Sequence, residues 1–251
     1  MKPKYEVISV TPNNVETYGL FCIKSQKNPG YIKKRDWFLQ EYPKGLRLKI
    51  LQEESGRQLG FIEYTPAEQA WRPVEAPSYL FIHCMYIYKK EDRRRGNASL
   101  LIKDCVEDAR RQGKAGVAVM TSDGPWIASK DVFFRNGFEQ VDQRGGFELL
   151  HYPLAKNAPP RLTDREVKPE QHQSWQLLYA NQCPWHQKCA EELLGFAKDK
   201  GIPLQITEIT NSATARNGAS PFGVFALVRG SKLLEYHYIS KTRFMNILKT
   251  T

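Results

Sequence analysis

The sequence predicts a two-domain α/β protein, and three observations support this fold class. Strand-like and helix-like stretches alternate through residues 1–154. A polar stretch with three prolines then covers residues 155–172, which is typical of a linker. The alternation starts again over residues 173–251. We therefore expect a larger first domain, a linker and a smaller second domain with these boundaries.

In the first domain, periodicity places each element. Residues 79–88 are aromatic and β-branched, the strongest strand signal in the chain. Leu101, Cys105 and Ala109 recur at helical spacing, so residues 98–112 form one amphipathic helix. The expected order is a strand at 5–10, helices at 14–25 and 31–41, a hairpin of 46–52 and 58–64, the strand 79–88, the helix 98–112, a strand at 116–121, a helix at 126–136 and a strand at 147–154.

The second domain repeats a strand–helix–strand order. A strand is expected over 174–180, a helix over 184–200 and a strand over 203–209. A loop over 211–221 precedes the remaining elements, which are strands at 223–229 and 232–238 and a helix from 242. This order is consistent with a small α/β domain.

Composition narrows the function classes. The 251 residues carry a net charge of +10, but the basic residues are spread over both domains, which argues against a nucleic-acid partner. No apolar run reaches the ~18 residues of a membrane span, and no leader-like segment opens the sequence. Five scattered cysteines are typical of reduced thiols. We expect a cytoplasmic protein without a membrane partner, with a homodimer as one option for its assembly.

A candidate phosphate-binding loop follows the strand 79–88. Residues 93–99, Arg-Arg-Arg-Gly-Asn-Ala-Ser, join this strand to the helix 98–112. Such a junction points backbone N–H groups and the positive helix end at one spot, where a pyrophosphate binds. Gly96 lets the backbone approach closely, and the arginines add Coulomb attraction. The loop has neither the Gly-Lys-Ser/Thr of a Walker motif nor the three glycines of a Rossmann fingerprint.

This loop resembles the acetyl-CoA loop of the GNAT family of N-acetyltransferases, whose pattern is Arg/Gln-x-x-Gly-x-Gly/Ala after a strand. Arg93, Gly96 and Ala98 fill its three defined positions. The order of elements over residues 1–154 is also similar, and residues 133–138 look like the family's Tyr-x-Lys-x-Gly-Phe ending. The resemblance implies a GNAT fold with a mixed central sheet. It also implies an acetyl-CoA-dependent N-acetyltransferase that acts on the amine of a small molecule.

The resemblance also assigns the cofactor site. In the family, the pantetheine arm pairs with the splayed end of the central strand, here the backbone of Met85, Tyr86, Ile87 and Tyr88. The pyrophosphate would then lie on the loop and first helical turn, that is on Arg93, Arg94, Arg95, Gly96, Asn97, Ala98 and Ser99.

Catalytic candidates are less clear, because Phe133 replaces the tyrosine that protonates the leaving thiolate in many family members. Tyr86, Tyr88 or water must then serve as the acid, or the domain is a non-catalytic CoA-binding module. His83 and Glu63 are the candidate bases, since a neutral imidazole or a carboxylate can accept the amine proton. For His83, a hydrogen-bonded core histidine is the alternative.

The segment 68–78 is a candidate for contact with the acceptor. It is long for a strand connection, so it could close over the acceptor site, with Trp71 or Arg72 as substrate-binding residues. The alternative is an ordinary surface loop.

The second domain has a cysteine at a helix start. Cys183 precedes Pro184, and a thiolate there is stabilised by the helix dipole. The order of elements resembles the thioredoxin fold, in which Pro221 would match the cis-proline. However, His186 stands where thioredoxins have their second cysteine, and Cys189 is six positions away, a rise of about 9 Å on a regular helix. A single reactive thiol is therefore easier than a Cys183–Cys189 dithiol.

The combination of the two domains resembles the YoaP-type acetyltransferases. The alternative function is a thiol-redox or thiol-sensing protein centred on Cys183, whose first domain only binds CoA. Cys183, His186 and Cys189 offer only three metal ligands at loose spacing, so no metal is expected. A structural cap with one exposed thiol is the simplest reading of the second domain.

Overall fold

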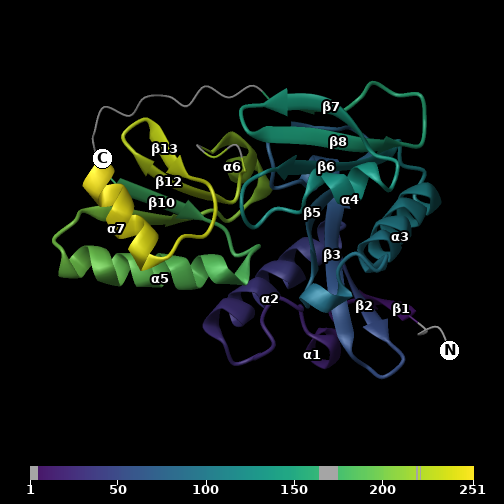
Figure 1. Ribbon diagram of the computed structural model, residues 1–251, viewed down its shortest axis with the longest axis horizontal. Helices are drawn as coiled ribbons and strands as arrows, with labels where there is room; N and C mark the ends of the chain where they lie inside the picture. The colour runs from purple at the N-terminus through teal and green to yellow at the C-terminus, as the bar shows by residue number, and fades with distance from the viewer. Residues whose placement is uncertain (1–4, 164–174, 219, 221) are drawn as a thin grey trace. The chain divides into compact units, whose positions relative to one another are not determined.

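The computed structural model describes residues 5–163, 175–218, 220 and 222–251. These residues form two compact units (Figure 1). The first unit contains the chain up to Lys24 together with Phe38–Ala70 and Val74–Thr163. Ser25–Trp37 and Trp71–Pro73 group with the C-terminal part of the chain in the second unit. The expected boundaries at 154 and 173 stay predictions, and residues 164–174 lie outside the described part.

A seven-stranded mixed sheet organises the first unit, as the fold class predicted. Its strand order is β1-β2-β3-β5-β6-β8-β7, and only the β5–β6 pair is parallel. The sequence does not predict β7, because most of its side chains are polar and exposed at the sheet edge. The strands are β1 Tyr5–Val10, β2 Arg47–Glu53, β3 Gln58–Pro66, β5 Tyr79–Ile87, β6 Gly116–Ser122, β7 Glu139–Arg144 and β8 Phe147–Pro153. A separate two-stranded sheet pairs β4 (Val74–Glu75) with β9 (Arg161–Leu162).

The helix α3 (Asn97–Arg111) packs its apolar stripe on this sheet. Leu101, Cys105 and Ala109 are fully buried in the core, as their spacing predicted. Two expected helices are short: α1 covers Val15–Tyr18 and α4 covers Lys130–Phe134. Gly19 ends α1 with a φ of 71°, and Ser129 caps α4 by accepting a hydrogen bond from the Asp131 amide. The helix α2 is Pro29–Glu41.

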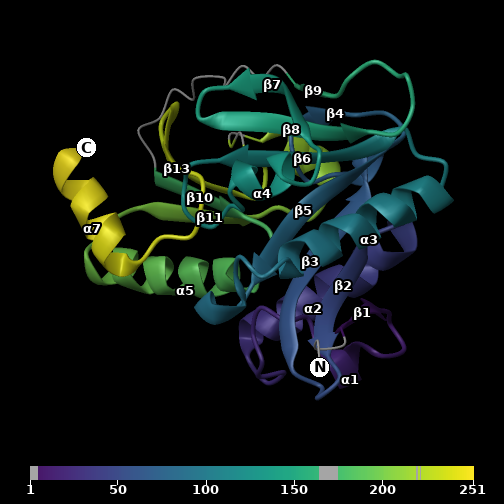
Figure 2. The same ribbon diagram turned by 45° about the vertical axis from the view of Figure 1, so that its right-hand side comes forward.

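The parallel pairing of β5 with β6 is brief. It runs from Tyr79↔Gly116 to Ile82↔Val119 and then stops. Beyond that point β5 continues along β3, whereas β6 continues along β8 (Figure 2). The β3–β5 register shifts at the same place, which leaves His83 as the extra residue of a β-bulge. The sheet is therefore split at one end, between β5 and β6.

The second unit contains a four-stranded sheet of order β11-β10-β12-β13. β10 and β11 are parallel and joined by a helix, and the other pairs are antiparallel. The helices α5 and α7 pack against each other, and both contribute to a core with the sheet. The elements are β10 Trp175–Tyr179, α5 Pro184–Asp199, β11 Leu204–Glu208, α6 Ser212–Asn217, β12 Phe225–Arg229, β13 Lys232–Glu235 and α7 Lys241–Thr250.

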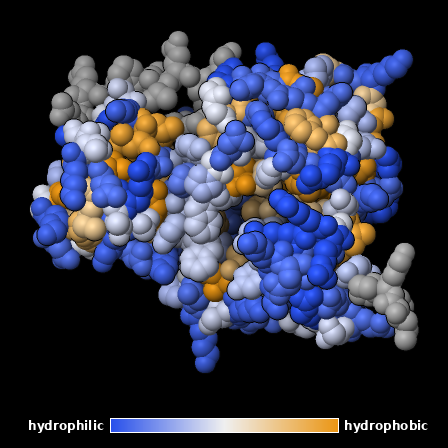
Figure 3. Space-filling model, in the orientation of Figure 1, coloured by the Kyte–Doolittle hydropathy of each residue, from blue (hydrophilic) through white to orange (hydrophobic). Residues whose placement is uncertain are grey.

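The exposed side chains are mainly hydrophilic on the face drawn in Figure 3, where apolar residues form only small groups. Among the large apolar side chains that remain exposed are Tyr86, Tyr88 and Trp126. Across the described residues, every helix is too short or too polar to cross a bilayer.

We predict that Gly116→Ala destabilises the first unit. A Cβ at Gly116 would lie 2.4 Å from the Tyr152 carbonyl oxygen and 2.5 Å from the Tyr79 ring, so the sheet must shift to admit it. The expected loss is about 1–3 kcal/mol of unfolding free energy, measured by denaturant titration. Gly146→Ala is the control, since its Cβ would meet nothing within 4 Å. Equal midpoints for the two variants would contradict the packing argument.

Candidate functional site

The loop between β5 and α3 has an unusual backbone. A short 3₁₀ turn, Lys90–Asp92, follows the strand, and α3 begins at Asn97. Between them Arg94 has a φ of 60° and Gly96 a φ of 85°, both in the left-handed region. The sequence has three consecutive arginines here, all exposed. Left-handed residues occur in the backbone turns that point successive N–H groups to the same side of a loop.

The backbone amides of this loop have no acceptor within the described part of the chain. Among the described residues, no hydrogen bond uses the N–H groups from Arg94 to Ser99, and Leu100 is the first to donate, to the Gly96 carbonyl at 3.1 Å. Unpaired amides at the positive end of a helix bind anions. A Cβ at Gly96 would meet nothing within 4 Å, so there is open space beside the backbone. This geometry is compatible with a pyrophosphate group, and binding of one by this loop stays a prediction.

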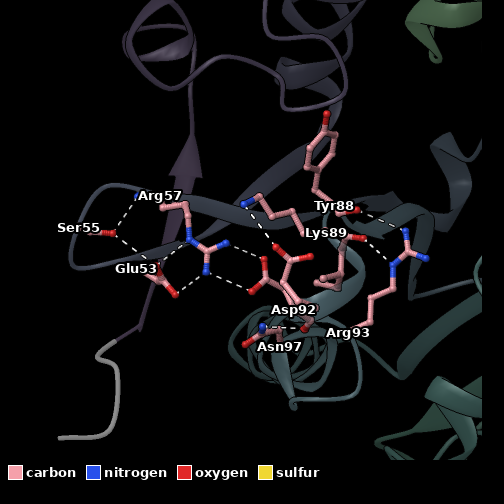
Figure 4. A network of polar contacts seen from close by, with 10 residues as sticks. Glu53, Ser55, Arg57, Tyr88, Lys89, Asp92, Arg93 and Asn97 are labelled. Carbon is pink, nitrogen blue, oxygen red and sulfur yellow. Dashed lines mark hydrogen bonds and ion pairs between the residues drawn. The ribbon is translucent and has the colours of Figure 1, made fainter.

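The ends of this loop are fixed by side chains (Figure 4). The side-chain amide of Asn97 donates to the Asp92 backbone carbonyl oxygen at 2.9 Å and so links the two ends of the loop. The Asp92 carboxylate in turn accepts two hydrogen bonds from Arg57, at 2.7 and 3.1 Å. The sequence does not predict this contact, because Arg57 and Asp92 are 35 positions apart and nothing in the sequence links them.

Arg93 folds back onto the end of β5. Its Nε donates to the Ile87 carbonyl at 3.1 Å, and its Nη2 donates to the Tyr88 carbonyl at 3.4 Å and to the Tyr86 hydroxyl at 2.8 Å. Tyr88 donates its amide to Leu59 on the β3 side. Because backbone groups alternate along an antiparallel pair, those of Ile87 and Met85 point away from β3, toward the split. The rings of Tyr86 and Tyr88 are about half exposed.

Glu63 and His83 lie together inside the first unit. Glu63 Oε1 is 3.6 Å from His83 Nδ1, longer than a hydrogen bond but close enough for an ion pair if the imidazole is protonated. Their side chains are 0% and 1% exposed. His83 is the bulge residue at which β5 leaves β6, and the Phe81 ring packs edge-on against it. The structure thus brings together the two base candidates from the sequence.

Other predicted site residues are buried. Phe133 is fully enclosed in the core against Phe138, so its position is a packing position in this chain. Trp71 packs edge-on against Trp37 within the second unit. Arg72 lies over the Phe222 ring and donates to the Gln182 side chain at 3.0 Å. A role for Trp71 and Arg72 in substrate binding stays a prediction.

The thiol region of the second unit has one accessible cysteine. Cys183 is the residue before α5 and is partly exposed. Cys189 is buried, and its Sγ donates to the Ile239 carbonyl at 3.3 Å. Burial raises the pKa of the Cys189 thiol to about 12, so it is protonated at neutral pH. Pro221 lies outside the described residues. In the described part of the chain, no three His, Cys, Asp or Glu side chains are grouped as metal ligands.

His186 does not supply a positive charge to this region. It is buried beside Phe225, with Nδ1 3.1 Å from the Ala180 carbonyl oxygen. Burial lowers the pKa of His186 from 6.5 to about 3, because the charged imidazole loses its hydration. The imidazole is therefore neutral at pH 7 and contributes no ionic stabilisation to a thiolate at Cys183.

Comparison with known proteins adds one relative that spans both units. No protein-family model matches the chain. It is 24% identical over 250 residues to YoaP of Bacillus subtilis (strain 168), an uncharacterized N-acetyltransferase, and the match covers 97% of this chain and 98% of that protein.

Solved structures match about two thirds of the chain or slightly less. The PaiA N-acetyltransferase of Thermoplasma acidophilum in complex with coenzyme A is 11% identical, with a TM-score of 0.44 over 60% of this chain and 99% of that one. The GNAT family N-acetyltransferase YhbS of Escherichia coli in complex with CoA is 14% identical, with a TM-score of 0.43 over 64% and 91%.

We predict that His186 makes the second unit acid-sensitive. Between pH 6.5 and 3 the unfolded chain takes up a proton at His186 that the folded chain does not, so stability is present above this window and is lost as the pH falls through it. The expected loss is on the order of 1 kcal/mol per pH unit. His186→Gln should therefore lose less stability between pH 7 and 5 than the wild type in denaturant titrations. If His186→Gln loses as much stability as the wild type over this pH range, the prediction is wrong.

Proposed function

We propose that this protein is an acetyl-CoA-dependent N-acetyltransferase that transfers an acetyl group to the amine of a small molecule. The observation that carries the proposal is the split between β5 and β6, followed directly by a loop whose backbone amides have no acceptor among residues 5–163, 175–218, 220 and 222–251. A split sheet offers a free strand edge to an extended ligand arm, and the loop offers donors to its phosphates. The likeness to an N-acetyltransferase over nearly the whole chain supports the same function.

In this proposal the cofactor lies along β5 and the loop. The amides from Arg94 to Ser99 bind the pyrophosphate, and the exposed Arg94 and Arg95 add positive charge. The outward backbone groups of Met85 and Ile87 face the split, where the pantetheine arm would pair. Because the Arg93 side chain donates a hydrogen bond to the Ile87 carbonyl oxygen, Arg93 would have to release that oxygen or share it with the cofactor. Acetyl-CoA supplies the acetyl group as a thioester.

The proton of the acceptor amine passes to the Glu63–His83 pair. His83 stands where the strands separate, next to the position expected for the thioester end of the arm. Because the site is enclosed, water does not compete with His83 for the amine proton. The Glu63 carboxylate, 3.6 Å away, stabilises the imidazolium that forms. Tyr86 and Tyr88 are the candidates to protonate the leaving thiolate, and the Tyr86 hydroxyl is already oriented by Arg93.

In this proposal the second unit is a thioredoxin-like domain that lacks a dithiol. Its strand order, with a parallel β10–α5–β11 unit and the antiparallel β12, β13 and α7, supports this topology. Cys189 is buried on the core side of α5, which argues against a disulfide with Cys183. The partly exposed Cys183 favours the alternative function, a thiol-redox or thiol-sensing protein.

Cofactor binding is tested by thermal unfolding with and without CoA. We expect CoA to raise the melting temperature of the wild type, because a ligand that binds only the folded state stabilises it. Gly96→Glu should abolish the rise by placing a carboxylate among the phosphate-binding amides. Gly113→Glu is the matched control, since Gly113 also has a positive φ and open space but lies beyond the other end of α3. If the wild type shows no rise at millimolar CoA, the acetyltransferase proposal fails and the thiol function of Cys183 becomes the better hypothesis.

The catalytic role of the buried pair is tested by kinetics. With an amine that the wild type acetylates, His83→Gln and Glu63→Gln should lower kcat by about 10²- to 10⁴-fold, because the amine loses its proton acceptor. Calorimetry should find their affinity for CoA close to that of the wild type. His151→Gln is the control, because His151 is another buried histidine of this sheet and contacts Tyr79 and Glu139 instead. Unchanged kcat in both variants would rule out the pair as the base.

A further inference from the structure

Arg57 joins two parts of the first unit that the sequence keeps apart. It lies at the turn of the β2–β3 hairpin, and its guanidinium is held between two carboxylates (Figure 4). On one side, Nε and Nη2 donate to Glu53 at 2.9 and 2.8 Å. On the other, Nη1 and Nη2 donate to Asp92 at 2.7 and 3.1 Å. Both contacts are bidentate, so the planar guanidinium is fixed in position and orientation.

Asp92 is the residue through which this contact reaches the phosphate-binding loop. It ends the 3₁₀ turn before the loop and is 4% exposed. The Arg57 hydrogen bonds are the main cause of a lowered pKa at Asp92, so its carboxylate is charged at neutral pH. The Asp92 carbonyl accepts the Asn97 side chain, which is itself buried at the first position of α3. The two ends of the loop therefore depend on where Asp92 is held.

The buried Asp92 carboxylate is a negative charge close to a loop that binds an anion in this proposal. An unpaired carboxylate beside the loop would repel phosphate groups, whereas one that is paired with Arg57 is largely neutralised. Glu53 completes the network, because it accepts hydrogen bonds from Nε and Nη2 of the same guanidinium. These bonds prevent the guanidinium from turning away from Asp92. This arrangement connects the hairpin to the loop without placing Arg57 among the phosphate-binding amides.

We propose that Arg57 is a positioning residue for the phosphate-binding loop, which it holds through Asp92 in the conformation that receives the cofactor. The proposal rests on the proposed function of the loop as the CoA site. A loop that is held in its binding conformation pays less ordering entropy when the ligand arrives. Lysine would replace Arg57 only in part, because an ammonium group keeps the charge but cannot make two bidentate contacts.

The test is the affinity for CoA, measured by calorimetry on the full chain. Arg57→Ala should raise the Kd for CoA about tenfold or more, as expected when charge-assisted hydrogen bonds that support a site are lost. Arg57→Lys, which keeps the charge, should show a smaller increase and guards against a variant that fails to fold. Arg111→Ala is the matched control: it removes one arginine from an exposed pair with Asp108 near the end of α3, and its Kd should stay within about twofold of the wild type.

A double-mutant cycle separates positioning from a merely structural role. If Arg57 acts through Asp92, then adding Arg57→Ala to Asp92→Asn should change the Kd little further, so the two effects are not additive. In ¹⁵N relaxation measurements, the amides of residues 93–99 should become more mobile in Arg57→Ala without any ligand. Additive effects on Kd, or a wild-type Kd in a folded but less stable Arg57→Ala, would overturn the proposal.

The controls also distinguish a failure of the Arg57 proposal from a failure of the proposed function. If the wild type and Arg111→Ala bind no CoA, the loop is not a CoA site and both proposals fall together. If the wild type binds CoA, Gly96→Glu does not, and the Arg57 variants bind as the wild type does, only the role of Arg57 is refuted.

Discussion

The separation of β5 from β6 is the constraint on which the candidate site depends. Four residues of β5 pair with β6, and then each strand follows its antiparallel neighbour instead. The bulge at His83 coincides with that point, so one irregularity turns the strand, separates its outer edge from β6 and places a buried histidine beside Glu63. At the far end of that edge, Arg93 donates to the Ile87 carbonyl oxygen.

Positive and negative charges are balanced around the loop after β5, which is the proposed phosphate site. Its backbone amides, which have no acceptor in the described part of the chain, and its exposed arginines would favour a phosphate, but Asp92 lies buried next to them. Arg57 resolves this conflict from a different hairpin, and Glu53 holds Arg57 in turn. The resulting network stabilises the loop's position and cancels a charge that would oppose binding.

Burial determines the chemistry of the second unit. Of the residues that make Cys183 look like a redox centre, His186 is neutral and Cys189 is a protonated core thiol, both because they have lost contact with water. The helix dipole therefore remains as a stabilising influence on a Cys183 thiolate, without a charged His186. Cys189 and His186, whose spacing from Cys183 suggests redox chemistry, are both buried: Cys189 lies in the core of the unit, and His186 packs against Phe225.

The sequence by itself determined the features that depend on neighbours in the chain. Periodicity identified the buried stripe of α3 and the central strand, and local composition identified the loop at Gly96, because these properties arise within a few residues. The tertiary structure alone decided the rest. The Arg57–Asp92 contact, the meeting of Glu63 with His83 and the assignment of residues 25–37 and 71–73 to the second unit all join distant positions. Spacing in a sequence carries no information about such contacts, because chain folding brings these residues together.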